Sequence, residues 1–297
     1  MGRYTTPDFS SIALTTIDVQ RDTLDGQPLE IPGTSAVLPG LRKLLQAFRG
    51  ARLPIVHLVR LYKPDGSNVD LCRRALVEGG ARILLPGSPG SQLAPELLPD
   101  PAVRVDHDLL LSGGIQALGP NEVILYKPRW GAFFGTPLEV HLRELGVTTL
   151  AFTGCNFPNC PRTSIYEASE RDFRIILVRD AVSGLYPRGE EEMHDIGVSL
   201  LTAAEVAEAV LQGRRGYRGQ SPLSGGSGRP PDSSFRWGGG RGSQSPAETG
   251  EGPGQQGMTR WTTASQLRNR GTGGRAPCRR VRGMSPRFFL PLGRGAG

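Results

Sequence analysis

Three side chains that could together perform nucleophilic acyl transfer stand just past three apolar segments of the sequence. Asp18 follows the run SIALTTI, Lys127 follows EVILY, and Cys160 ends the run TGCNFPNC that comes after TTLAF. A thiolate is a strong nucleophile, a nearby cation favours its formation, and a carboxylate can carry the thiol proton to a leaving amine. An acid, an amine and a thiol in one pocket would therefore support cleavage of an acyl C–N bond.

The residues around Cys160 favour it as the nucleophile. Pro161 suits the first turn of a helix, so we expect the Cys160 sulfur at the positive end of a helix dipole, which together with Lys127 would lower the pKa of the thiol. The backbone N–H groups of the loop 154–160 are candidates for holding an oxyanion. Cys155, five residues earlier, is the rival nucleophile, and the predicted helix start favours Cys160 over it.

The segments that must position these residues predict an α/β fold. Apolar segments predict strands at 11–18, 54–60, 122–126, 148–153 and 174–178. Amphipathic or capped segments predict helices at 36–49, 69–78, 137–145, 162–171, 190–200 and 203–211. Strands and helices that alternate in this way indicate a three-layer α/β/α sandwich around a central, mainly parallel sheet. In such a sheet the ligand lies beyond the carboxyl ends of the strands, which is where the three reactive residues fall.

Two motifs give a resemblance to a known family over roughly residues 10–200. Residues 127–136 read KPRWGAFFGT and are similar to a pattern K-x-R-x-S-A-F-x-x-T, departing only at Gly131. Residues 160–168 read CPRTSIYEA and are similar to C-V-x-x-T-A-x-D-A, with Ser164 for Thr and Glu167 for Asp. With an acid after the first strand, the chain resembles the isochorismatase-like superfamily of cysteine hydrolases.

The resemblance implies an active site and a reaction. It implies that Asp18, Lys127 and Cys160 are catalytic, and that a non-proline cis peptide joins Cys155 to Asn156. The backbone N–H groups of Asn156 and Cys160 would then form the oxyanion hole. Apart from the resemblance, Arg129 and Trp130 are candidate substrate-binding residues, because Arg129 offers a planar cation and Trp130 an aromatic face. The alternative is that both residues only pack in their loop.

We expect neither a metal nor any other cofactor. Nicotinamidases of the family hold a metal through an Asp-x-His pair and a further His after the second strand, and the sequence His57-Leu58-Val59-Arg60 and its continuation lack the pair. The segment 106–108, Asp-His-Asp, could ligate a cation, and solvated loop charge is the simpler interpretation. True isochorismatases cleave an enol ether and do not carry this cysteine, so Cys160 argues against that chemistry.

The expected substrate is a small amide, ureido compound or lactam. Residues 60–91, with the three catalytic candidates, resemble actinobacterial members of the family, and one activity among these is opening of the streptolidine lactam of streptothricin antibiotics. Hydrolysis of a cyclic amide, and with it antibiotic resistance, is therefore one hypothesis beside hydrolysis of linear amides. The alternative from a different class is a catalytically weak member of the same fold that binds a small molecule or scaffolds an oligomer.

The chain divides by composition into a hydrolase domain, 1–214, and a basic tail, 215–297. The tail holds 14 Arg, no Lys, three acids and 20 Gly, a composition that cannot bury enough apolar surface to offset its conformational entropy, so we predict disorder there. The tail alone carries +11 and leaves −4 for the domain, so the net charge of +7 gives no reason to expect nucleic-acid binding by the folded part.

The remaining expectations concern surroundings and assembly. No segment approaches the roughly 18 apolar residues of a membrane span, and the N-terminus lacks the apolar core of a signal peptide. A cysteine that must stay a thiol fits a reducing cytoplasm. By analogy with the family we expect a homo-oligomer. A nucleotide-binding protein would need a Gly-rich loop after the first strand, where DVQRDTLDG stands, and a serine hydrolase would need G-x-S-x-G.

Overall fold

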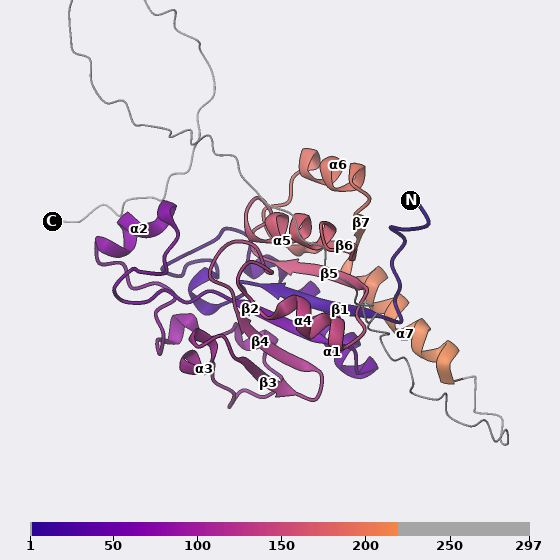
Figure 1. Cartoon of the computed structure of the whole chain (residues 1–297), viewed down its shortest axis with the longest axis horizontal. Helices are drawn as coiled ribbons and strands as arrows, with labels where there is room; N and C mark the ends of the chain where they lie inside the picture. Colours follow the sequence, from indigo (N-terminus) through magenta and orange to yellow (C-terminus); the bar gives the residue numbers. More distant parts are fainter. Residues whose placement is uncertain (1, 219–297) are drawn as a thin grey trace, which may run out of the picture. The chain divides into compact units, whose positions relative to one another are not determined.

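A seven-stranded sheet organises the part of the chain that the structure, a computed structural model, describes: residues 2–218, with side chains to 213 (Figure 1). The order of strands across the sheet is β3-β4-β2-β1-β5-β6-β7, and all neighbours run parallel except β3 and β4, which are antiparallel. The strands are β1 (Ile12–Ile17), β2 (Ile55–Val59), β3 (Ile115–Gly119), β4 (Glu122–Tyr126), β5 (Thr149–Gly154), β6 (Arg174–Val182) and β7 (Ser199–Leu201).

Helices cover both faces of this sheet, because its central strands are apolar on both sides. Every residue of β1, β2 and β5 is buried. The α-helices are α1 (Leu38–Ala51), α2 (Leu71–Glu78), α3 (His107–Leu111), α4 (Leu138–Glu144), α5 (Cys160–Ser169), α6 (Pro187–Asp195) and α7 (Ala203–Arg218). The predicted three-layer α/β/α sandwich with a mainly parallel sheet is confirmed.

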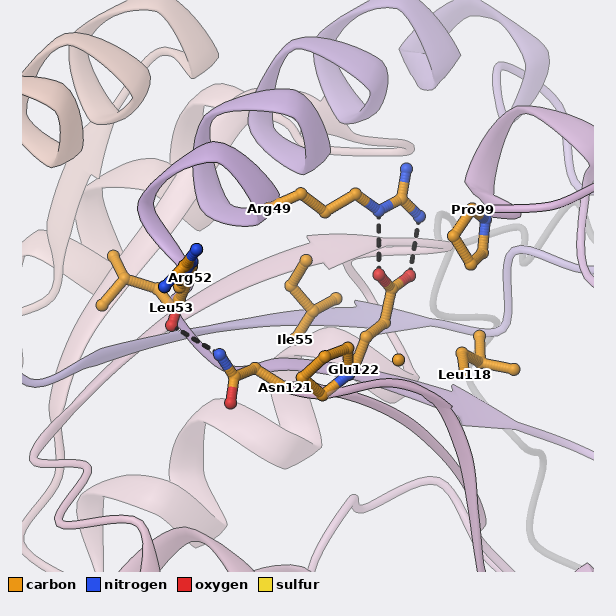
Figure 2. Close-up of a pocket in the computed structure, with 10 residues that line it drawn as sticks. Arg49, Arg52, Leu53, Ile55, Pro99, Leu118, Asn121 and Glu122 are labelled. Carbon is orange, nitrogen blue, oxygen red and sulfur yellow. Dashed lines mark hydrogen bonds and ion pairs between the residues drawn. The ribbon is translucent and has the colours of Figure 1, made fainter.

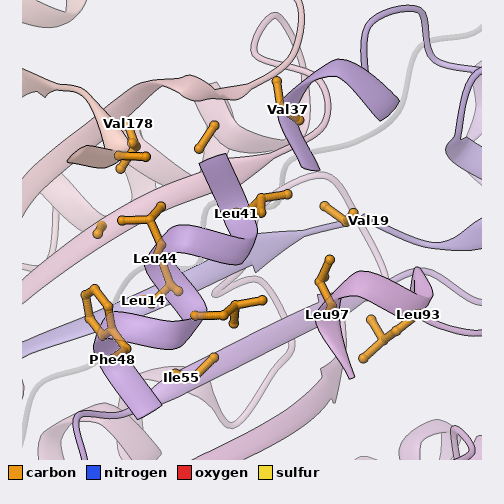
Figure 3. Packing of buried hydrophobic residues seen from close by; sticks show 14 of the residues in the cluster. Leu14, Val19, Val37, Leu41, Leu44, Phe48, Ile55, Leu93, Leu97 and Val178 are labelled. Carbon is orange, nitrogen blue, oxygen red and sulfur yellow. The ribbon is translucent and has the colours of Figure 1, made fainter. Parts of the chain in front are cut away.

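Alternate residues of each strand enter two separate cores. On one face Leu14 and Ile55 pack with Leu41, Leu44 and Phe48 of α1, and α7 joins the same core (Figure 3). On the other face the core is formed by α4, α5 and α6 against the intervening strand residues, which include Ala13, Ile17, Val56 and Phe152. This alternation fixes which face of the sheet each strand side chain enters.

Three elements differ from the sequence expectations. The predicted helix 190–200 is wrong in its second half, because α6 ends at Asp195, Gly197 turns the chain at a φ of 85°, and Ser199–Leu201 forms the edge strand β7. Neither β3 nor α3 was predicted, and β3 is a partly exposed edge strand without a clear apolar alternation. The helix α7 continues to Arg218, past the predicted domain end at 214, and the rest of the predicted tail lies outside the described residues.

The carboxyl ends of four neighbouring strands bring the chemistry together. Asp18 directly follows β1, Arg60 follows β2, and Lys127 follows β4, while β5 leads through Gly154 to Cys160 at the start of α5. Gly154 has a φ of 103°, and a Cβ there would stand 2.2 Å from the Ile17 carbonyl oxygen, so only glycine lets β5 leave the sheet this close to β1.

Among the described residues, no helix is long and apolar enough to cross a membrane.

Candidate active site

A buried ion pair forms the floor of the site. Lys127 Nζ donates a hydrogen bond to Asp18 Oδ2 at 2.8 Å and a longer one to the Arg129 carbonyl oxygen at 3.3 Å. The Lys127 side chain is fully buried and that of Asp18 is 6% exposed. The other carboxylate oxygen, Asp18 Oδ1, is buried and accepts no hydrogen bond from the part of the chain that the structure describes. One acceptor of the pair is therefore left for chemistry.

Cys160 shares a pocket with this carboxylate. It is the first residue of α5, with Pro161 in the first turn, and both it and Asp18 line the same small cavity. The predicted convergence of Asp18, Lys127 and Cys160 therefore holds in space, while their catalytic roles remain a proposal. The rival thiol, Cys155, is fully buried and donates to the Asp18 carbonyl oxygen at 3.1 Å, which fixes it in the strand end.

The expected lowering of the thiol pKa is wrong. Burial, and after it the negative charge of Asp18, raise the pKa of Cys160 to about 12, against smaller opposing effects of Lys127 and Arg60. The helix start and the ammonium group do not overcome removal of the sulfur from water. At neutral pH the resting site therefore holds a thiol, whose proton must leave during attack. The candidate acceptor for this proton is Asp18 Oδ1, a carboxylate oxygen without a hydrogen-bond partner in the described chain.

The loop between β5 and α5 has the features expected of an oxyanion hole. The peptide bond Cys155–Asn156 is cis, as the family resemblance implied. Within the described residues, neither the Asn156 N–H nor the Cys160 N–H donates a backbone hydrogen bond, although their neighbours Phe157 and Asn159 both do. Two free donors beside the thiol provide what a tetrahedral oxyanion requires.

The pocket is small and is lined by residues that the sequence reasoning did not select. It is narrow, with about 290 Å³ of empty space when the open solvent at its mouth is included. Besides Asp18, Cys155, Asn156 and Cys160 its walls include Thr23, Leu29, Ile31, Arg60, Tyr62, Arg73 and Leu84. Arg60 stands at a strand end like Asp18 and Lys127, so the rule that located those two would also have located it.

Arg129 and Trp130, the predicted substrate-binding residues, are not among the residues that line this pocket. The Arg129 guanidinium donates to the carbonyl oxygens of Asn68 and Pro128, and Trp130 is 36% exposed. The contribution of Arg129 that the structure shows is its carbonyl oxygen, which accepts from Lys127 Nζ. The contacts of the Arg129 side chain are those of loop packing, and substrate binding by Arg129 and Trp130 stays a prediction.

The departures from the family motifs compensate one another. A Cβ at Gly131 would stand 2.1 Å from Glu167 Oε1, so the longer Glu167 occupies the space that a serine at 131 would need. Glu167 Oε2 in turn accepts from the Phe133 N–H at 2.8 Å. Ser164 Oγ accepts from the Ala132 N–H and donates to the Cys160 carbonyl oxygen. The loop after Lys127 is thus bonded directly to the helix that carries the thiol.

Within residues 2–218 no group of three or more His, Cys, Asp or Glu side chains is arranged to hold a metal ion. In the segment 106–108, Asp106 caps α3 by accepting from the Leu109 N–H, and His107 Nε2 lies 2.8 Å from Ser91 Oγ. Both side chains therefore have structural partners.

A second and larger cavity opens at the opposite, amino edge of the sheet (Figure 2). It holds about 1020 Å³ on the same measure and is lined by Arg49, Arg52, Leu53, Ile55, Pro99, Leu118, Gly119, Pro120, Asn121 and Glu122. Arg49 and Glu122 face each other across it as an ion pair, with two hydrogen bonds between the guanidinium and the carboxylate. It contains no nucleophile and none of the residues that the sequence singled out.

Comparison with known proteins agrees with the fold and the motifs. A family model described as the isochorismatase domain matches residues 113–208. A maleamate amidohydrolase of Pseudomonas putida is 30% identical over 177 residues, which cover 57% of this chain and 71% of that protein. A probable inactive nicotinamidase of Arabidopsis thaliana is 26% identical over 203 residues, covering 66% of this chain and 94% of that protein.

A solved structure supports the same conclusion. The crystal structure of an isochorismatase family protein from Desulfovibrio vulgaris superposes with a TM-score of 0.58 at 27% identity, over 68% of this chain and 98% of that one. Fold, motif order and sequence similarity together define a hydrolase with a three-layer α/β/α fold. The chain belongs to the isochorismatase-like hydrolase superfamily.

Proposed function

We propose that the protein hydrolyses the C–N bond of a small amide or ureido compound through an acyl-thioester on Cys160. The observation that carries the proposal is the state of the Asp18 carboxylate. One oxygen is held by Lys127 Nζ at 2.8 Å, and the other is buried and unpaired in the pocket of the thiol.

The first half of the reaction transfers the acyl group to sulfur. The Cys160 Sγ–H proton moves to Asp18 Oδ1 as the sulfur attacks the substrate carbonyl carbon. The carbonyl oxygen becomes an oxyanion, which accepts hydrogen bonds from the N–H groups of Asn156 and Cys160. The intermediate collapses by breaking the C–N bond, and Asp18 returns the proton to the leaving nitrogen, which departs as ammonia or an amine.

The second half returns the enzyme to its thiol. Water enters where the amine has left, and Asp18 Oδ1 takes one of its protons as the oxygen attacks the thioester carbon. The C–S bond breaks, and the sulfur recovers its proton from Asp18. Lys127 keeps its charge throughout and holds the carboxylate in position through Oδ2, so a single buried acid serves both halves.

The relatives and the pocket bear on the substrate class. The relative from Pseudomonas putida is an amidohydrolase by name, which supports C–N bond cleavage here. A cyclic amide would be cut by the same bond changes, with both products retained in one molecule. The pocket is narrow, so opening the streptolidine lactam of streptothricin would require the loops over it to move.

The test is turnover by wild type, Cys160→Ser and Cys155→Ser on linear amides, ureido compounds and lactams, with streptothricin included. Released amine or the mass change is followed by mass spectrometry without added metal. We expect turnover by wild type and by Cys155→Ser, and loss of at least about 1000-fold in Cys160→Ser. Equal activity in Cys160→Ser would contradict the mechanism and point to Cys155.

A second candidate is a member of the fold that binds a small molecule without turning it over. The observation in its favour is the similarity to a relative named as a probable inactive nicotinamidase. It predicts that wild type leaves every compound of the set intact yet is stabilised against heat by one of them. Turnover of any compound that depends on Cys160 would exclude it.

A further inference from the structure

Arg60 is a buried cation with donors that the fold does not use. The residue is 3% exposed and lines the pocket of Cys160. Its Nη2 donates to Asp70 Oδ2 at 2.5 Å, whereas Nε and Nη1 are buried and donate to no acceptor in the described chain. Two buried guanidinium nitrogens without partners reduce the stability of the fold. An arginine with a purely structural role is expected to have its buried N–H groups paired.

The surroundings keep this cation charged. Although burial acts to lower it, the neighbouring Tyr62, Asp18 and Asp70 raise the pKa of Arg60 above its usual value. The guanidinium carbon lies 5.3 Å from the centre of the Tyr62 ring, within the range of a cation–π contact. Arg60 is therefore charged at neutral pH.

The charges around the pocket do not balance. The ion pair of Asp18 with Lys127 is one to one. Asp70 instead faces two guanidiniums, Arg60 at 2.5 Å and Arg73 at 3.6 Å, and Arg73 also lines the pocket. While Cys160 is a thiol, the lining residues and their ion-pair partners thus carry one positive charge in excess. A ligand with a single negative charge would neutralise it.

We propose that Arg60 binds a carboxylate of the substrate, so that the protein acts on small amides or ureido compounds that carry a carboxylate. The proposal rests on the proposed function and deepens it. A planar guanidinium with free N–H groups matches a carboxylate in shape and charge. One excess charge and a small pocket favour a carboxylate over a phosphate ester. Lys127 is not available for this role, because its ammonium is committed to Asp18 and Arg129.

The experiment uses matched pairs of probes that differ in one charged group. Succinamate is compared with succinamide, and N-carbamoylglycine with its amide, by ammonia release from the full chain. We expect kcat/KM of wild type to be at least about 30-fold higher for the acid of each pair. Equal or better use of the neutral members by wild type would overturn the proposal.

Substitutions then test whether Arg60 is the cause. We expect Arg60→Gln to lower kcat/KM for succinamate about 100-fold, mainly through KM, and for succinamide less than about threefold. Arg60→Lys keeps the charge and should retain part of the preference. Arg188→Gln, an exposed arginine paired with Glu191 and Glu192 outside the pocket, should leave both values unchanged. An equal loss on both members in Arg60→Gln would show a merely structural role and overturn the proposal.

Binding without turnover separates this proposal from the proposed function. In Cys160→Ser, calorimetric titration should show succinamate bound more tightly than succinamide, and adding Arg60→Gln should remove the difference. Selective binding that needs Arg60, in a wild type that turns over none of the probes, would uphold the carboxylate site and contradict the hydrolase. Turnover that depends on Cys160 but is equal for the acid and neutral probes would support the proposed hydrolase function and overturn the carboxylate site at Arg60.

Discussion

Two clusters of buried charge lie at opposite ends of β4 and differ in how completely they are paired. Glu122 begins this strand, and Lys127 directly follows its end. Each belongs to an ion pair whose partner comes from a distant part of the chain, Arg49 for Glu122 and Asp18 for Lys127. The two carboxylates are equally buried, whereas the Arg49 side chain is 29% exposed and that of Lys127 is fully buried. The hydrogen bonding of the two clusters differs as well.

The cluster at the amino edge is saturated. Glu122 Oε1 accepts from Arg49 Nη2 and contacts His57 Nε2 at 2.8 Å, while Oε2 accepts from Arg49 Nε (Figure 2). The other ring nitrogen of His57 is bonded to Thr16 Oγ1. Although burial acts to raise it, these bonds bring the pKa of Glu122 down to about 2. The arrangement holds α1, β1, β2 and β4 together, and both carboxylate oxygens of Glu122 have partners.

The cluster at the carboxyl edge is kept unsaturated. Asp18 Oδ1 and two nitrogens of Arg60 are buried without partners in the described chain, and both residues line the pocket of Cys160. Unpaired polar atoms in a protein interior reduce its stability and are retained where they serve a ligand or a reaction. Similar residue types at the two ends of one strand are thus fully paired at one end and, under the proposed function, left available for the reaction at the other.

The largest expected effect is that of Asp18→Asn on activity. The amide keeps the size of the side chain but removes the proton acceptor for the Cys160 thiol, so we expect kcat to fall about 1000-fold or more. The variant leaves Lys127 buried without its anion, so its fold is checked by near-UV circular dichroism before rates are compared. A variant that is folded and keeps more than a tenth of the activity would contradict the assigned role.

The matched substitution at the other end of β4, Glu122→Gln, should lower stability instead. Losing the charge leaves Arg49 without its partner, and we expect the free energy of unfolding to fall by about 2 kcal/mol, with kcat changed less than about threefold. Urea unfolding and a rate assay on the same preparations measure both. A large loss of activity with unchanged stability would reverse the contrast between the two ends.

The same variant should change the response to acid. Because folding depresses the pKa of Glu122 from 4.5 to about 2, its contribution is present above pH 4.5 and is lost as pH falls toward 2. Wild type should therefore lose stability faster than Glu122→Gln across this window. Equal slopes for the two proteins would show that this carboxyl does not stabilise the fold by its charge.

The sequence predicted the positions of the reactive residues better than their properties. Asp18, Lys127 and Cys160 follow buried strands or open a helix, and such signals are local, so they could be placed at one edge of the sheet without coordinates. The cis peptide at Cys155–Asn156 followed from the motif and is present. Arg60 occupies an equivalent strand end, directly after β2, so the same local signal marks it as a candidate for the site.

What the sequence could not predict depends on packing between distant segments. The raised pKa of Cys160 comes first from burial, which no local pattern around Pro161 reports. Arg129 and Trp130 lie in a loop whose path is set by contacts with α5 and with Asn68, and residue types alone do not report such contacts. The strand β7 could not be predicted for a different reason: its three residues show too little periodicity to be distinguished from the end of a helix.

A smaller effect concerns the protonation state of the thiol. Since the pKa of Cys160 is raised to about 12, the reactive thiolate fraction should keep increasing tenfold per pH unit through the neutral range. We therefore expect the rate of Cys160 alkylation by iodoacetamide to rise from pH 6 to pH 9 without a plateau, as followed by mass spectrometry of the modified peptide. A plateau below pH 8 would show a preformed thiolate stabilised by Lys127 and would weaken the case for Asp18 as proton acceptor.

The smallest expected effect tests how the unsaturated end is kept rigid. Gly131→Ser would place a Cβ against the Glu167 carboxylate and force it off the Phe133 N–H, to which it is bonded at 2.8 Å. We expect this to cost about 1 to 2 kcal/mol of stability and to lower kcat severalfold, because the loop after Lys127 is joined through these bonds to the helix of Cys160. Glu167→Asp shortens the acid and makes room, so the double variant should recover most of both losses. A double-mutant cycle measures the coupling energy between positions 131 and 167. Additive losses would show that the two positions do not interact. Recovery in the double variant would show that glycine at 131 and glutamate at 167 depend on each other.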